Sequence, residues 1–243
     1  MPIRQEASLK DFAFRGFDEI NEAVRKLIAG ELRELYIVGD YGAGKTHLAM
    51  AIDNHYTATT KRSTINLSLK DLLEQDPEAT ALLGLEMFDL IIIDDLQEVR
   101  HSYDWQTGLF DLINKVREQQ KQLLFLADNP ARELQIGLLD LVTRLSLCPL
   151  LTMPSFEHAD DRDQLLNTIL KNKSLKLPDE VHQHLVQEGP RNAGDMIVVL
   201  GHIMPLFTLL KNTRIPKKTI NEAKAVIDRE TFLLEVTNHG QNN

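Results

Sequence analysis

A glycine-rich turn between a predicted strand and a predicted helix constrains this chain most. Residues 39–46 have the sequence GDYGAGKT and match the pattern G-x-x-x-x-G-K-[ST] without a mismatch. The apolar residues 35–38 before the turn predict a strand, and the residues after it, to Tyr56, predict a helix. A turn in this setting is typical of α/β domains built around a parallel sheet.

The same turn predicts a phosphate-binding loop. Its glycines allow backbone N–H groups to point at phosphate oxygens, and the helix that follows adds the positive end of its dipole. In such loops the lysine reaches the β- and γ-phosphates and the hydroxyl residue ligates Mg²⁺. We therefore expect ATP or ADP with Mg²⁺, bound by Gly39, Tyr41, Gly42, Ala43, Gly44, Lys45, Thr46 and His47.

A second motif, LIIIDD at residues 90–95, predicts a buried strand that ends in two acids. Ligands of α/β sheets bind at the carboxyl ends of the strands. We expect Asp94 to join Thr46 in the magnesium site, as the acid of this motif does in P-loop nucleotidases. We expect Asp95 to orient the water that attacks the phosphate.

The order of the predicted elements indicates two domains. Strand-like and helix-like segments alternate up to residue 154, with strands expected at residues 35–38, 63–67, 88–94, 123–127 and 149–153. Only helices are predicted after that, at residues 160–173, 179–188, 192–211 and 218–227, and Pro205 should kink or split the third. We predict an α/β nucleotide-binding domain at 1–154, a helical lid domain at 155–232 and a flexible tail at 233–243.

Charge excludes a general nucleic-acid binder, because the 243 residues carry a formal net charge of −9. One basic stretch lies against this trend and contains Lys211, Arg214, Lys217, Lys218, Lys224 and Arg229. It is either a solvated helical face or a docking site for DNA or an acidic partner. Without a membrane span or a secretory signal, and with Cys148 as the one cysteine, we expect a cytoplasmic protein.

Four segments resemble, in the same order, the AAA+ ATPases of the replication initiator DnaA and most closely its shorter relative Hda. The segments are GDYGAGKTHLAMAI, FDLIIIDDLQEV, LFDLINKVREQQKQLLFLADNP and LLDLVTRL, and the resemblance extends from about Ser8 to Ile227. It implies a five-stranded parallel sheet with a small helical lid. It also implies a regulator that pairs with DnaA and promotes hydrolysis of the ATP that DnaA binds.

The resemblance gives two further residues a role. Asp128 corresponds to the sensor-1 residue, which detects the γ-phosphate, and Arg144 to the arginine finger, which reaches the nucleotide of a neighbouring subunit. From the residues alone, Asp128 could instead be a turn cap and Arg144 a surface arginine. Phe12, Phe14 and Phe17 are either core residues or part of an adenine pocket.

Three departures from the family pattern affect these expectations. Gly194 stands at the sensor-2 position, where the family has an arginine, so we expect weak intrinsic ATP hydrolysis. Residues 5–9, QEASL, match the family's sliding-clamp motif only in part. The family's helix-turn-helix domain has no counterpart, so we expect no direct recognition of origin DNA.

Two other functions stay open at this stage. Helicase loaders and transposition-targeting ATPases of the DnaC and IstB type share the loop, although their second motif usually ends in Asp-Glu. A nucleotide-dependent adaptor without turnover would also accommodate Gly194. The sequence does not decide whether the chain forms a homo-oligomer.

Overall fold

The computed structural model of this chain describes residues 7–13, 16–75, 79–208 and 215–241. Contacts divide the chain into two units. The first comprises Met1–Phe12, Phe17–Asp40 and Lys45–Met153, and the second comprises Ala13–Gly16, Tyr41–Gly44 and Pro154–Asn243. The tip of the glycine-rich turn is therefore grouped with the residues after Pro154.

A five-stranded parallel sheet forms the centre of the first unit, as expected from the resemblance. Its order is β2-β3-β4-β1-β5. The five predicted strands are all confirmed, with ends shifted by one or two residues: β1 Glu34–Val38, β2 Thr64–Ser68, β3 Leu90–Asp94, β4 Gln122–Ala127 and β5 Leu150–Thr152. Strands β3 and β4 are buried along their whole length, because helices cover both faces of the sheet.

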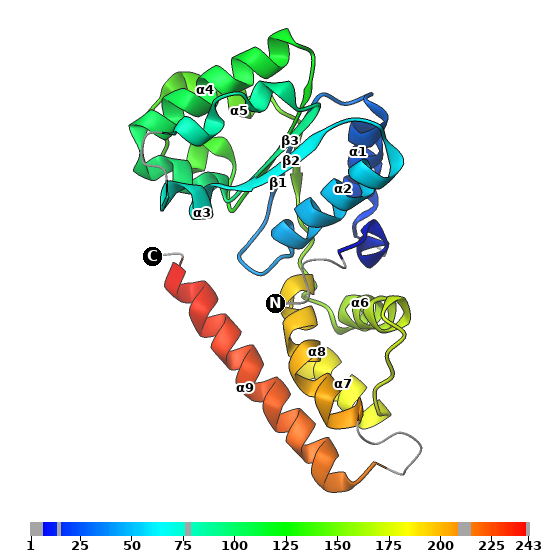
Figure 1. The fold of residues 1–243 in the computed structure, drawn as a ribbon. Helices are drawn as coiled ribbons and strands as arrows, with labels where there is room; N and C mark the ends of the chain where they lie inside the picture. The colour runs from blue at the N-terminus through cyan, green and yellow to red at the C-terminus, as the bar shows by residue number, and fades with distance from the viewer. Residues whose placement is uncertain (1–6, 14–15, 76–78, 209–214, 242–243) are drawn as a thin grey trace. The chain divides into compact units, whose positions relative to one another are not determined.

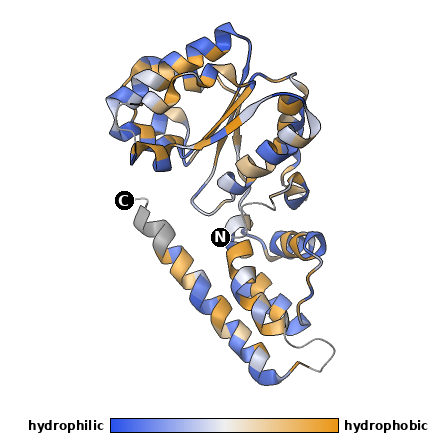
Figure 2. Cartoon of the chain, viewed as in Figure 1, coloured by the Kyte–Doolittle hydropathy of each residue, from blue (hydrophilic) through white to orange (hydrophobic). Residues whose placement is uncertain are grey.

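Figure 1 shows how the helices cover the two faces of this sheet. Helices α1 (Asp18–Ala29) and α2 (Lys45–Thr59) lie on one face, and α3 (Leu69–Leu73), α4 (Tyr103–Glu118) and α5 (Leu139–Ser146) lie on the other. Figure 2 shows hydrophobic strands between amphipathic helices, which carry both hydrophobic and hydrophilic residues. Short 3-10 turns complete the unit: η2 Leu9–Phe12, η3 Thr80–Leu82, η4 Leu85–Met87, η5 Leu96–His101 and η6 Ala131–Glu133.

The second unit is helical. It contains α6 (Ala159–Asn172), α7 (Asp179–Glu188), α8 (Ala193–Thr208) and α9 (Lys217–Gln241), and α9 packs on α7 and α8. Among the described residues no helix is both long enough and apolar enough to cross a membrane.

Two helices differ from the sequence prediction. Helix α8 is not split at Pro205 but continues to Thr208. A proline costs the bond to the carbonyl four residues earlier, here Gly201, and both residues are exposed, so water can satisfy that carbonyl. Helix α9 continues past Ile227 to Gln241, through the predicted tail. Good helix formers stand in the first half of the segment after Ile227, namely Arg229, Glu230, Leu233, Leu234 and Glu235.

Candidate nucleotide-binding site

The strand order brings the two motifs close together at the carboxyl edge of the sheet. Strand β4 lies between β1, which leads into the glycine-rich turn, and β3, which ends in Asp94. Asp128 directly follows β4, so it emerges between the two motifs. On the other side of β3, Ser68 at the end of β2 is in register with Asp94.

Lys45 is the first residue of α2 and is almost fully buried, with 8% of its surface exposed. Its Nζ donates to the carbonyl oxygens of Gly39 (2.6 Å) and Asp40 (3.1 Å) and to Oδ1 of Asp128 (3.0 Å). Three acceptors therefore compensate the buried charge. The structure brings the predicted phosphate lysine and Asp128 into direct contact.

Asp94 is buried, and the pKa of its carboxyl group is raised. It is 2% exposed, and this burial, together with the neighbouring Asp95, raises its pKa to about 6. A hydrogen bond with the Thr46 side chain and one from the Asp95 N–H to Oδ1 (2.9 Å) oppose the shift. The second oxygen, Oδ2, is buried and has no hydrogen-bond partner among the described residues.

This donor set fits a magnesium ion. Mg²⁺ prefers oxygen ligands and is usually held by one or two carboxylates together with substrate phosphates and water. Asp94 supplies an unsatisfied carboxylate oxygen next to the Thr46 hydroxyl. The described residues contain no group of three or more His, Cys, Asp or Glu side chains that could hold a metal alone.

Asp95 adopts a left-handed backbone conformation, with φ at 56° and ψ at 39°. Asp and Asn tolerate this region better than most residues do. Ser68 Oγ donates to Oδ2 of Asp95 (2.8 Å), and Gln97 Nε2 lies 3.5 Å from Oδ1. The turn thus points the Asp95 carboxylate at the end of β2, where Ser68 holds it.

Gly194 lies against the tip of the glycine-rich turn within the second unit. A Cβ atom at Gly194 would lie 2.3 Å from the carbonyl oxygen of Gly42 and 3.3 Å from the nitrogen of Gly44. Gly42 itself has φ of 77°, and the Asp195 carboxylate lies directly over it. The sequence indicated only a missing charge at position 194, whereas the structure shows that the backbones approach too closely for any side chain.

His47, which follows the loop, packs against residues before α1. His47 Nε2 lies 2.9 Å from Oδ2 of Asp11, and the rings of His47 and Phe12 are 5.6 Å apart. Phe12 and Phe17 are buried core residues. Phe14, the third aromatic residue proposed for an adenine pocket, lies outside the described residues.

Arg144 is in the last turn of α5, on the sheet face opposite α2. Its guanidinium carbon lies 5.8 Å from the centre of the Phe110 ring on α4, within the range of a cation–π contact. The structure thus does not bring Arg144 together with Lys45 and Asp94.

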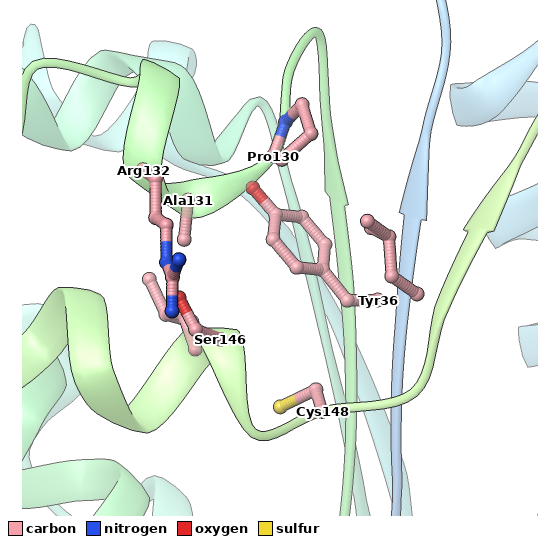
Figure 3. Close-up of a pocket in the computed structure, with 8 residues that line it drawn as sticks. Tyr36, Pro130, Ala131, Arg132, Ser146 and Cys148 are labelled. Carbon is pink, nitrogen blue, oxygen red and sulfur yellow. The ribbon is translucent and has the colours of Figure 1, made fainter.

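A separate recess of about 180 Å³ lies beside the end of α5 (Figure 3). In this view the Tyr36 ring comes from the sheet, Cys148 lies below it, and Arg132 and Ser146 face it. The walls are mostly apolar and contain none of the predicted site residues: they are Tyr36, Pro130, Ala131, Arg132, Leu145, Ser146, Cys148 and Leu150.

Sequence reasoning missed Ser68, whose one signal was a polar side chain directly after the strand expected at residues 63–67. Two other expectations fall partly outside the described residues. These are the clamp motif, at Gln5 and Glu6, and the basic stretch, at Lys211 and Arg214. Within the described part of that stretch, Lys217 and Lys218 are exposed.

The model of the bacterial DnaA ATPase domain matches residues 10–148. A Haemophilus influenzae protein described as uncharacterized is 30% identical over 76% of this chain and 80% of its own length. The chromosomal replication initiator protein DnaA of Treponema denticola is 28% identical over 78% of this chain, which spans only 40% of that relative.

Solved structures share the fold. Domain III of the Thermotoga maritima replication initiation protein DnaA superposes with a TM-score of 0.77 at 20% identity, over 95% of this chain and 99% of that domain. The AMPPCP-bound DnaA of Aquifex aeolicus superposes with a TM-score of 0.69 at 23% identity, over 82% of this chain and 65% of that one.

Proposed function

Because this chain belongs to the family of the bacterial DnaA ATPase domain, we propose that it regulates replication initiation in the manner of Hda. It binds ATP or ADP with Mg²⁺, pairs with DnaA through AAA+ surfaces and promotes hydrolysis of the ATP that DnaA holds. We place it in the cytoplasm, where DnaA acts.

The nucleotide part of this proposal rests on the buried carboxyl edge of the sheet. Lys45 would contact the β- and γ-phosphates, and its 3.0 Å ion pair with Asp128 orients the Lys45 side chain. Thr46 and Asp94 would hold Mg²⁺, which would supply positive charge against the phosphates. The AMPPCP bound by the DnaA of Aquifex aeolicus, which shares this fold, supports nucleotide binding by this chain.

The chain's own turnover is expected to be weak. Asp95 is the residue that would orient water, and its carboxylate is held by Ser68. Position 194 offers no cation for the phosphates, because only a glycine fits against Gly42. A nucleotide site of this kind suits a switch better than a fast ATPase.

The position of Arg144 supports the regulatory part of this proposal. Its guanidinium lies on Phe110, on the sheet face opposite α2, and so away from the loop that this chain uses for phosphate. An arginine finger supplied from outside stabilises the charge of the phosphoryl-transfer transition state and contributes on the order of 10³-fold or more in rate. We assign that role to Arg144, acting on the nucleotide of DnaA.

Phosphate release from mixtures of ATP-loaded DnaA and this protein tests the function, with and without the DNA-loaded sliding clamp. We expect release faster than the sum of the separate proteins, and loss of the gain in Arg144→Ala with its own nucleotide binding unchanged. A clamp requirement would show that residues 5–9 act as a clamp motif. No gain under any condition would reject the regulator, and capture of the replicative helicase or a transposase would then indicate a loader or targeting factor.

A further inference from the structure

Two residues of helix α4 contact Arg144. Phe110 lies under the guanidinium at 5.8 Å, and Arg117 Nη2 donates to the backbone carbonyl oxygen of Arg144 at 3.0 Å. Phe110 and Arg117 are seven residues apart, which puts them on one face of the helix. One contact fixes the tip of Arg144 and the other fixes its backbone.

Arg117 is itself fixed to the central sheet. Its Nε and Nη2 donate to the two carboxylate oxygens of Glu34, at 2.5 and 2.8 Å, and Glu34 begins β1. Such a two-pronged pair holds a guanidinium in one orientation, which a lysine cannot reproduce. The Glu34 side chain is 15% exposed, so solvent screens this pair less than it screens a surface pair.

Cys148 closes the same cluster. Its Sγ lies 3.3 Å from Oε2 of Glu34 and 3.8 Å from the carbonyl oxygen of Arg144. Burial and the Glu34 charge raise the pKa of the thiol to about 12, so it remains protonated and can donate. The Arg144 carbonyl oxygen also accepts from the Leu147 N–H at 3.3 Å, so Arg117 and Cys148 add side-chain donors to a carbonyl in the last turn of α5.

We propose that Arg117 and Glu34 are positioning residues for the arginine finger. Through the Arg144 carbonyl they hold the end of α5, and so set where the guanidinium lies when α5 faces the nucleotide of a partner AAA+ domain. This inference rests on the proposed function for its effect on rate. The ordering of Arg144 does not depend on a partner.

The expected effect is on rate rather than on partner affinity. Misplacing a catalytic group by about 1 Å can cost on the order of 100-fold in rate. Arg117→Lys keeps the positive charge but loses the fork, and Glu34→Gln keeps one acceptor but loses the charge. We expect either variant to lower the maximal rate of partner ATP hydrolysis by roughly 10- to 100-fold, with the half-saturating concentration unchanged within about 3-fold.

Arg25→Lys is the matched control. Arg25 makes the same two-pronged contact with Glu22, at 2.9 and 2.8 Å, but on the exposed surface of α1. We expect this variant to stimulate like the wild type. A thermal melt of each variant shows that it is folded, and if Arg117→Lys does not fold, Glu34→Gln carries the test alone.

The experiment combines a titration of ATP-loaded DnaA with NMR of the arginine Nε–Hε groups in the free protein. The Arg144 signal is assigned by its loss in Arg144→Ala, and its order parameter should fall in Arg117→Lys and Glu34→Gln but not in Arg25→Lys. Wild-type order and wild-type maximal rate in both variants would overturn the positioning role. If wild type itself fails to stimulate DnaA, the proposed function is wrong, and the NMR order of Arg144 alone then decides the inference.

Discussion

Among single residues, Asp94 shows most directly how function and stability oppose each other. An isolated carboxylate buried away from water is costly, and this one keeps Oδ2 without a partner in the described structure. Its pKa, raised to about 6 by burial, records that cost. The raised pKa means that folding favours the protonated form of Asp94 more than the unfolded chain does.

This gives a pH-dependent prediction for Asp94→Asn. A carboxyl group whose pKa is raised on folding contributes stability below its unfolded pKa, and this contribution is lost as the pH rises through about 6. At pH 8 the nucleotide-free variant should therefore be more stable than wild type by about 2–3 kcal/mol. Urea denaturation at several pH values measures this, and the difference should disappear near pH 4. A variant less stable than wild type at pH 8 would show that Asp94 is stabilising when charged.

The residues that could be predicted from sequence are those whose role is set by near neighbours in the chain. The turn at residues 39–46 and the acid at the end of β3 belong to short motifs. The contact of Ser68 with Asp95 and that of Arg117 with Glu34 depend on strand register and helix packing across the sheet. Nothing local in the sequence specifies such a contact.

Among the elements, the buried strands β1, β3 and β4 were predictable because helices bury both faces of the sheet there, which favours continuous apolar runs. Helix ends were less predictable, since they depend on caps and on solvent. Pro205 does not end α8, and α9 extends to Gln241 past Asn238 and Gly240, residues that often mark the end of a helix. The close approach of Gly194 to Gly42 is likewise a tertiary property.

Arg162 leads to a prediction for the helical unit. It is 7% exposed on α6, and its guanidinium donates to the carbonyl oxygens of Phe156, Glu157, Val186 and Gln187. Arg162→Met should destabilise this unit by about 3 kcal/mol or more, because hydrogen bonds from a charged group contribute about 1.5–3 kcal/mol each. Urea denaturation followed by far-UV circular dichroism measures the loss.

Arg191→Met serves as the control for Arg162. Arg191 pairs with Glu157 at 2.7 Å, but its side chain is 65% exposed. An exposed ion pair contributes about 0–1 kcal/mol, so this variant should change little. Equal, small losses in the two variants would mean that Arg162 does not join α6 to the end of α7.

For the molecule as a whole, bound nucleotide should raise the free energy of unfolding. A ligand that binds only the folded state stabilises it by about 2.7 kcal/mol at one hundred times its dissociation constant. Mg·ADP should therefore raise the melting temperature of wild type and of Lys61→Ala, an exposed lysine, but not that of Lys45→Ala. A full shift in Lys45→Ala would exclude the glycine-rich turn as the phosphate site.

The central claim is that Arg144 acts on a nucleotide held by another protein. The most direct measurement is a single turnover in which only DnaA carries γ-labelled ATP and this protein is in excess. We predict that wild type and Arg132→Ala, a nearby exposed arginine, accelerate release of labelled phosphate. The Arg144→Ala variant should bind DnaA without accelerating the release of labelled phosphate. Equal acceleration by Arg144→Ala, or none by wild type, would contradict the account.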